Sequence, residues 1–157
     1  MPLLIPVTTV EVDGIASFVT KEKFREGTVT DGVKMVWTGE NFDENFLDKT
    51  EEKDVAGTLL RIQRLKNASS DAQIITELGN THETTLSHCW ELLKKQGLGE
   101  NGALLVNGYG NIAYIRGRYD ILWAVRFCWH IVVDGWGVEA HSQNSWEWYA
   151  GYHIISR

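Results

Sequence analysis

Residues 121–144, ILWAVRFCWHIVVDGWGVEAHSQN, carry the strongest structural signal of the chain. A long apolar run leads into Asp134-Gly135, a dipeptide favoured in two-residue type I′ turns, and a second alternating segment follows. The pattern therefore predicts a β-hairpin in which Val133 pairs directly with Trp136. The faces assigned to the side chains below depend on this register.

One face of the predicted hairpin is apolar. Side chains alternate between the two faces of a strand, so every second residue of the first strand projects to the same side. One such set is apolar throughout, and we predict that it faces the core: Trp123, Val125, Phe127, Trp129, Ile131 and Val133.

The opposite face of the hairpin combines charged, thiol and imidazole side chains. In the predicted register the pairs on this face are His130 with Glu139, Cys128 with His141, and Arg126 with Gln143. Directly opposite residues project to the same face, with Cβ atoms about 4.5 to 5.5 Å apart. Thiolate, imidazole and carboxylate groups suit zinc, and iron or nickel are also compatible. The candidate metal ligands are Cys128, His130, Glu139 and His141.

Two other interpretations of this face remain open. Cys128 would be a catalytic nucleophile and His141 its base if a neighbouring imidazolium favours the thiolate. A cysteine in the middle of a strand, however, lacks the field of a helix N-terminus that activates many such nucleophiles. In the second interpretation the face has no function. It is solvated, as one face of an antiparallel sheet commonly is, or it is partly covered at its apolar end, near Leu122 and Ala124, by the helix that contains Leu86.

Aromatic residues are concentrated in the last third of the chain. The chain of 157 residues has seven tryptophans, and five of them lie between Trp123 and Trp148. Trp136, Trp146 and Trp148 fall at a predicted turn, a loop and a segment end, where rings are often partly exposed. With Arg126 they form a candidate binding surface for a protein, a peptide or a carbohydrate, or a surface buried between the copies of a homo-oligomer.

The order of the predicted elements indicates an α+β fold with an antiparallel sheet. Residues 3–38 predict strands broken by turns, and the pattern from Ala103 onward is that of a β-meander. The clearest helix is predicted within residues 80–97, where Asn80 is a candidate N-cap. Its apolar side would pack on one face of the sheet, as the one main helix of a single globular domain spanning 1–157.

The composition favours a cytoplasmic protein and argues against nucleic acid as a partner. The formal net charge is −6, and basic residues do not cluster into a face that tracks a phosphate backbone. No apolar run approaches the roughly 18 residues that span a bilayer, and Met1–Val10 show no signal peptide. Cys89 and Cys128 are too few for a disulfide framework, so we expect reduced thiols.

Three segments of the C-terminal third, NGYGNIAYI, VDGWGVEAHS and EWYAGYHIISR, carry a resemblance. They are similar to a region that recurs in uncharacterised bacterial hypothetical proteins, chiefly of candidate phyla. The resemblance covers residues 102–157 best and HETTLSHCWELLKKQG, residues 82–97, less well. It implies no activity, cofactor or partner.

The residues themselves favour a non-enzymatic binding or interaction domain that uses the aromatic-rich hairpin surface. No cofactor is expected apart from zinc, should the metal site form. The alternative is a metal-dependent or cysteine hydrolase with its site on the 126–143 hairpin. An enzyme site requires the donor side chains to converge beside a pocket, whereas a binding surface does not.

Overall fold

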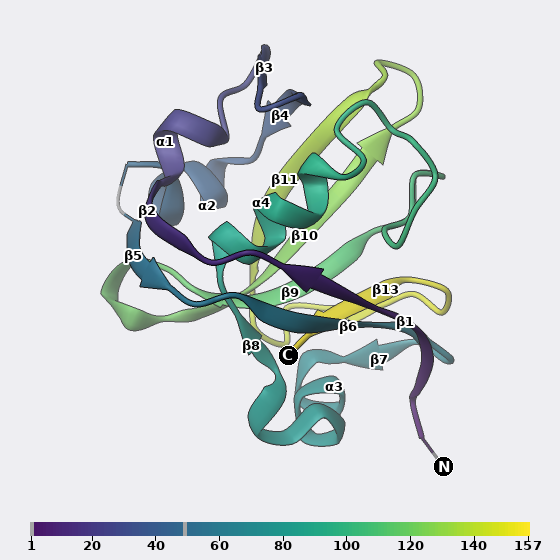
Figure 1. The fold of residues 1–157 in the computed structure, drawn as a ribbon. Coiled ribbons are helices and arrows are strands. Elements are labelled where there is room, and N and C mark those ends of the chain that lie inside the picture. The colour runs from purple at the N-terminus through teal and green to yellow at the C-terminus, as the bar shows by residue number, and fades with distance from the viewer. Residues whose placement is uncertain (1, 49) are drawn as a thin grey trace.

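The structure, a computed structural model, describes residues 2–48 and 50–157. Its scaffold is a nine-stranded sheet (Figure 1). The strands are, in spatial order, β1 (Leu4–Val12), β6 (Thr58–Leu65), β13 (His153–Ser156), β9 (Asn111–Arg116), β10 (Leu122–His130), β11 (Gly135–Ser142), β4 (Val33–Thr38) and β3 (Thr28–Thr30), with β8 (Glu83–Thr84) also paired to β9.

Two small sheets and several short helices surround the large sheet (Figure 1). The small sheets pair β2 (Ile15–Val19) with β5 (Glu51–Val55) and β7 (Ser69–Ser70) with β12 (Glu147–Trp148). The helices are α1 (Thr20–Lys23), α2 (Glu40–Phe42), α3 (Asp71–Leu78) and α4 (Leu86–Lys94), with a π-helical turn at Asp43–Leu47 and 3₁₀ turns at Gly79–Thr81 and Arg118–Asp120. In the described part of the chain, no helix is long and apolar enough to cross a membrane.

The α+β class is confirmed, but the large sheet is mixed rather than antiparallel. Strand β11 pairs in parallel with β4, and both β13 and β8 pair in parallel with β9. The last strand, β13, lies between β6 and β9 in the middle of the sheet, where all of its residues are buried. The predicted meander is wrong at this point because the order of strands in the sequence does not determine their neighbours in the sheet.

The prediction of one main helix is also wrong, because α3 and α4 have eight and nine residues respectively. Helix α4 begins at Leu86 and not near Asn80. The Thr85 hydroxyl accepts a hydrogen bond from the backbone N–H of His88 at 3.3 Å and so forms the N-cap, while the residues before it extend as β8. Helix α3 starts at a capping box, in which the Ser70 hydroxyl accepts a hydrogen bond from the Gln73 backbone N–H and the Gln73 side chain accepts one from the Ser70 backbone N–H.

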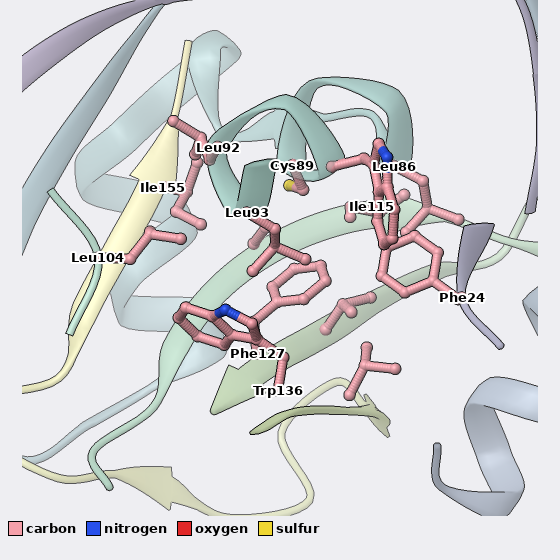
Figure 2. Close-up of a cluster of buried hydrophobic side chains, with 14 of the residues drawn as sticks. Phe24, Leu86, Cys89, Leu92, Leu93, Leu104, Ile115, Phe127, Trp136 and Ile155 are labelled. Carbon is pink, nitrogen blue, oxygen red and sulfur yellow. The ribbon is translucent and has the colours of Figure 1, made fainter. Parts of the chain in front are cut away.

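Helix α4 covers one face of the large sheet and closes the main hydrophobic core. We call this face the helix-covered face; on β10 it carries Val125, Phe127 and Trp129. Figure 2 shows the apolar side chains of α4 directed toward the strands that carry Phe127 and Trp136. Val125, Phe127 and Trp129 are all buried, so the alternation predicted for β10 is correct up to Trp129.

A helix covers the opposite face of the sheet only near the start of β10. We call it the Arg126 face; on β10 it carries Leu122, Ala124, Arg126, Cys128 and His130. Leu122 and Ala124 join a second, smaller core together with side chains of α3, and not of the helix that contains Leu86, which lies on the other face. Arg126, Cys128 and His130 are only partly buried, so the polar half of this face remains accessible.

The turn between β10 and β11 is longer than predicted. The pair Val133–Trp136 does not form; Trp129 pairs with Trp136 instead, and residues 131–134 make a four-residue turn. The predicted core row therefore ends at Trp129. The turn exposes three apolar side chains, two of which were predicted to be core: Ile131, Val132 and Val133.

Gly135 explains why the predicted turn is wrong. A type I′ turn needs a positive φ at both central residues, but only Asp134 of the dipeptide has one, at 48°. Gly135 instead lies in β11, where a Cβ atom would overlap the side chain of Val36 on β4. The glycine is required by the close approach of β4, and not by the turn.

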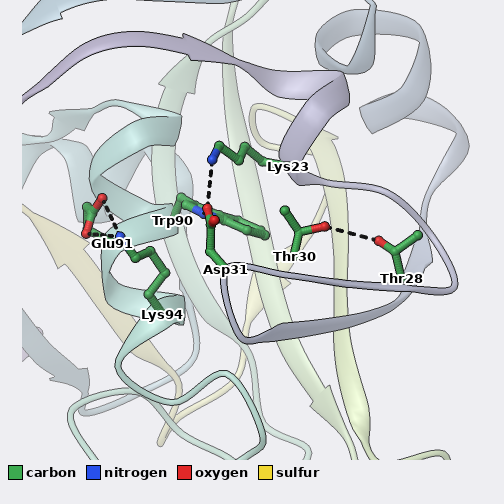
Figure 3. Close-up of polar contacts among 7 residues, drawn as sticks. All are labelled: Lys23, Thr28, Thr30, Asp31, Trp90, Glu91 and Lys94. Atoms are coloured by element: carbon green, nitrogen blue, oxygen red, sulfur yellow. Dashed lines mark hydrogen bonds and ion pairs between the residues drawn. The ribbon is translucent and has the colours of Figure 1, made fainter.

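Asp31, in the turn between β3 and β4, ties the N-terminal half of the chain to α4 (Figure 3). Its carboxylate accepts hydrogen bonds from the Lys23 ammonium at 2.7 Å and from the Trp90 indole N–H at 2.9 Å. Because both donors stabilise the ionised form, the pKa of Asp31 lies below its usual value. The neighbouring pair Lys94–Glu91, 3.1 Å apart, lies along α4.

Candidate functional site

The Arg126 face keeps the polar side chains of β10 and β11 on one side despite the different register. Trp136 pairs with Trp129 instead of Val133, a displacement of four positions, and an even displacement leaves each side chain on its face. The neighbours nevertheless change. Arg126 lies opposite Glu139, Cys128 opposite Gly137, and His141 opposite Ala124.

The four predicted metal ligands do not converge. Among residues 2–48 and 50–157, no three His, Cys, Asp or Glu side chains lie close enough to hold a metal ion. Glu139 has a different role, because its Oε1 accepts backbone hydrogen bonds from Phe42 at 3.0 Å and from Ala140 at 2.8 Å. A Cβ atom on Gly39 would overlap this carboxylate, which therefore fixes the start of α2. The zinc site predicted from Cys128, His130, Glu139 and His141 is not assembled.

Cys128 does not have the environment of a catalytic nucleophile. Its thiol donates a hydrogen bond to the carbonyl of Gly108 at 3.0 Å. Burial raises the pKa of Cys128, and the charge of Arg126 opposes this shift only in part. The thiol therefore stays protonated at neutral pH, whereas nucleophilic cysteines are thiolates. The predicted base, His141, is not its cross-strand partner.

His141 belongs to an aromatic cluster instead. Its ring centroid lies 4.6 Å from that of Trp146 and 5.2 Å from that of Trp148. Burial lowers the pKa of His141 to about 4, and the nearby charge of Arg126 adds to this shift. The imidazole is therefore neutral at physiological pH, and its buried Nε2 has no hydrogen-bond partner within the described residues.

A pocket of about 210 Å³ opens beside this cluster. We call it the aromatic pocket, and its lining residues are Arg126, Trp146, Glu147, Trp148, Tyr149 and Tyr152. Trp146 and Tyr149 are 50% and 68% exposed, whereas Trp148 and Tyr152 are buried. Three of the four predicted binding residues, Arg126, Trp146 and Trp148, thus lie in one pocket.

The fourth, Trp136, lies elsewhere. Its side chain is fully buried on the helix-covered face, and its indole N–H donates to the carbonyl of Gln96 at 2.9 Å. Its ring meets that of Trp129 edge to face, with the centroids 5.7 Å apart. The prediction that Trp136 contributes to a binding surface is wrong, because the register places it inside β11 rather than at the turn.

Asp71, the first residue of α3, fixes the buried wall of the aromatic pocket. Its carboxylate accepts hydrogen bonds from the Trp148 indole N–H at 2.6 Å, the Tyr114 hydroxyl at 2.7 Å and the Asn144 backbone N–H at 2.8 Å. Three donors compensate for the burial of this carboxylate. Burial raises the pKa of Tyr114, so its hydroxyl remains a donor. In the sequence, nothing distinguishes Asp71 from the other acidic residues, because its donors belong to distant segments.

Arg126 supplies an uncompensated positive charge. In the described part of the chain its guanidinium forms no ion pair or hydrogen bond, and Glu139, directly opposite, is bound by backbone donors. Burial lowers the pKa of both His130 and His141, and repulsion from Arg126 lowers them further. Both imidazoles are therefore neutral at physiological pH, and Arg126 carries the positive charge of this face.

A second pocket shares Arg126 with the aromatic pocket. It has a volume of about 400 Å³ and is lined by Val36, Trp37, Arg126, His130 and Val133. The ring of His130 lies over Gly137, where a Cβ atom would overlap its Nε2, and meets Trp37 edge-on at 6.1 Å. Sequence reasoning missed Trp37 because it reaches the hairpin only through the pairing of β4 with β11.

The other aromatic residues that line the pocket belong to a segment that stands out in the sequence. Four of the seven residues in 146–152 are aromatic, the densest aromatic segment of the chain. Tyr149 and Tyr152 complete the pocket with the two tryptophans of this segment. Nothing in the sequence indicated that Glu147, which lies between those tryptophans, also lines the pocket.

Comparison with protein-family models, with curated proteins and with solved structures finds no match to this chain. The resemblance to bacterial proteins noted for residues 102–157 therefore stays a prediction. A function has to be inferred from the geometry of the site itself.

Proposed function

We propose that this protein is a non-enzymatic binding module that holds a small organic anion in the aromatic pocket. The observation that carries this proposal is the guanidinium of Arg126, unpaired within residues 2–48 and 50–157, in a pocket lined by the rings of Trp146, Trp148, Tyr149 and Tyr152. The guanidinium presents several N–H donors in a planar fork that matches carboxylate and phosphate oxygens. The rings offer apolar contact area for the rest of the ligand.

The cost of leaving Arg126 unpaired supports the proposal. A partly buried charge without a partner loses part of its hydration and gains no compensating contact. An incoming oxyanion would supply that contact, and hydrogen bonds between ionised groups are about twice as strong as neutral ones. The neighbouring imidazoles are neutral, so they do not attract the anion away from Arg126.

The size of the pocket favours a small ligand over an extended one. A volume of about 210 Å³ suits a single sugar acid, the end of a peptide or a compact phosphate ester. The groups predicted for hydrolysis do not support an enzyme, because Cys128 is held as a thiol and the four metal donors lie apart. Binding without chemistry is therefore the function that the geometry favours.

Tryptophan fluorescence tests the proposal, because Trp146 and Trp148 line the pocket. Three anionic probes would be titrated: glucuronate, phenyl phosphate and 3,3-dimethylbutyl phosphate. We expect at least one of these probes to quench the fluorescence saturably. The Arg126→Gln variant should bind that probe about tenfold or more weakly, because it loses the hydrogen bond between the guanidinium and the oxyanion of the probe.

Arg118→Gln is the matched control. Arg118 lies over the ring of Tyr119 at 4.5 Å, outside the pocket, so its removal should leave the affinity unchanged. No saturable binding of any probe would overturn the proposal. So would equal affinities for the wild type and the Arg126→Gln variant.

A further inference from the structure

The lining of the aromatic pocket carries charges of both signs. Arg126 is the cation and Glu147 is the acid of the lining. Within residues 2–48 and 50–157, neither side chain forms an ion pair, so the two charges do not neutralise each other. A ligand that pairs with both Arg126 and Glu147 must therefore carry a negative and a positive group.

We propose that the aromatic pocket binds a zwitterion in which a methylated ammonium group is joined to an oxyanion, as in phosphocholine. The oxyanion contacts Arg126, and the ammonium group lies among the aromatic rings near Glu147. This inference rests on the proposed function, because it specifies the ligand of the same pocket.

The orientation of the rings supports an ammonium group. Trp146 and Trp148 meet at 83° and Tyr149 and Tyr152 at 77°, whereas Trp148 and Tyr152 are inclined by only 33°, so the two exposed rings stand steeply against the two buried ones. Steeply inclined rings surround a compact group from several directions, whereas a sugar prefers one flat platform. Cations bind to ring faces through the ring quadrupole, and quaternary ammonium groups are recognised in this way.

The nature of the ammonium group follows from the hydrogen-bonding capacity of the lining. A primary ammonium group brings three N–H donors, each of which needs an acceptor once it leaves water. The described lining contains four aromatic residues and a single carboxylate residue, Glu147. A trimethylated, quaternary ammonium group such as that of phosphocholine has no N–H donors to satisfy, and its methyl groups match the apolar rings.

The position of Arg126 explains why a simple cation is a poor ligand. Its charge repels a second positive charge, and it depresses the pKa of His141 beyond the effect of burial. A lone choline or methylammonium ion meets this repulsion without compensation. An oxyanion on the same molecule turns the repulsion into an attraction, so the zwitterion is preferred over either of its halves.

A first experiment compares three probes by calorimetry: phosphocholine, choline and 3,3-dimethylbutyl phosphate. The last has the shape of phosphocholine with a neutral carbon in place of the ammonium nitrogen. We expect phosphocholine to bind about tenfold more tightly than the carbon analogue, from cation–π and carboxylate contacts, and choline to bind most weakly.

Two variants locate the ammonium group. Glu147→Gln should weaken phosphocholine binding several-fold while leaving the carbon analogue unaffected, and Trp146→Leu should weaken phosphocholine more than the analogue. Both residues are exposed, so neither change should unfold the protein, which circular dichroism would check. Glu11→Gln is the matched control, since Glu11 is an exposed acid outside the pocket.

The outcomes separate the two proposals. Equal affinities for phosphocholine and its carbon analogue, both sensitive to Arg126→Gln, would overturn the zwitterion and leave the anion-binding function intact. Absence of binding by all three probes, together with failure of the other anions, would overturn both. Tightest binding of choline would also contradict both, because Arg126 would then have no ligand.

Free phosphocholine and a phosphatidylcholine headgroup share this chemistry. Sedimentation with phosphatidylcholine vesicles, compared with phosphatidylglycerol vesicles, distinguishes the two sources. Sedimentation with the first alone assigns the site to a lipid headgroup, and its absence alongside binding of free phosphocholine assigns it to a soluble ligand; either result supports the zwitterion. Sedimentation with phosphatidylglycerol alone would contradict it.

Discussion

The two faces of strand β10 differ although they are built from alternate residues of the same nine. On the helix-covered face, Phe127 and Trp129 lie beneath α4 in a continuous apolar core. On the Arg126 face, α3 covers only the end near Leu122, and Arg126 and Cys128 remain partly exposed. The same strand thus serves the core on one side and a pocket on the other.

This difference shows how a pocket forms where the helix that covers a sheet face ends. Polar groups buried without partners are costly, so a face closed by a helix becomes apolar throughout. Arg126 is tolerated because α3 does not cover its position, so its guanidinium stays partly in contact with water. The aromatic segment that contains Trp146 and Trp148 lines the same pocket, and no described residue of that segment forms an ion pair with Arg126. Three changes would break or sharpen this comparison.

The largest effect is expected on the helix-covered face. Phe127→Ala should lower the free energy of unfolding by about 3 to 5 kcal/mol, because it removes a fully buried ring and leaves a cavity. Cys128→Ala, one residue away on the other face, should cost about 1 kcal/mol or less. Urea denaturation measures both, and similar costs for the two variants would contradict the contrast between the faces.

A smaller effect is expected at Gly135, on the Arg126 face. Gly135→Ala should cost about 1 to 3 kcal/mol, because the new methyl group overlaps the side chain of Val36. Val36→Ala should relieve this overlap, so the double variant should lose less stability than the sum of the single changes. Additive costs would show that Gly135 serves the turn and not the packing of β4.

The smallest effect concerns the pH dependence of stability. The pKa of His141 is about 4 in the folded protein and 6.5 in its ordinary state, so the unfolded chain binds a proton more readily between these values. The stabilisation is complete above about pH 6.5 and is lost as the pH falls through about 4. His141→Phe keeps a ring beside the indoles but does not titrate, so stability should decline less steeply on acidification.

Urea midpoints between about pH 7 and about pH 4.5 would test this expectation. The lowered pKa values of His130 and His153 would leave the variant with some residual dependence in the same direction. Superimposable pH profiles for the wild type and the variant would contradict the assignment of His141 as a buried neutral imidazole.

Local patterns predicted much of the geometry around β10. The alternation that placed Phe127 and Arg126 on opposite faces survived a displaced register, because the displacement was even. The density of aromatic residues near the C-terminus also singled out the segment that lines the aromatic pocket. Both predictions rest on residues that are close together in the sequence, because strand alternation and aromatic density are local properties of the chain.

These local patterns could not predict which distant segments of the chain pair with each other or come into contact. Gly135 was assigned to a turn because its contact with Val36 depends on β4, about a hundred residues earlier in the chain. The predicted metal ligands were adjacent only in a register that does not form. Asp71 was missed because its three donors come from Tyr114, Asn144 and Trp148.

The sequence by itself determined the α+β class, the two faces of β10 and the aromatic character of the C-terminal segment. These follow from periodicity and composition, which act over a few residues. The tertiary structure alone decided that the sheet is mixed, that Trp136 is core, and that Arg126, which has no ion pair among the described residues, shares a pocket with four aromatic rings. The reason is physical: burial and charge compensation depend on which distant groups a side chain meets, and the fold brings those groups together.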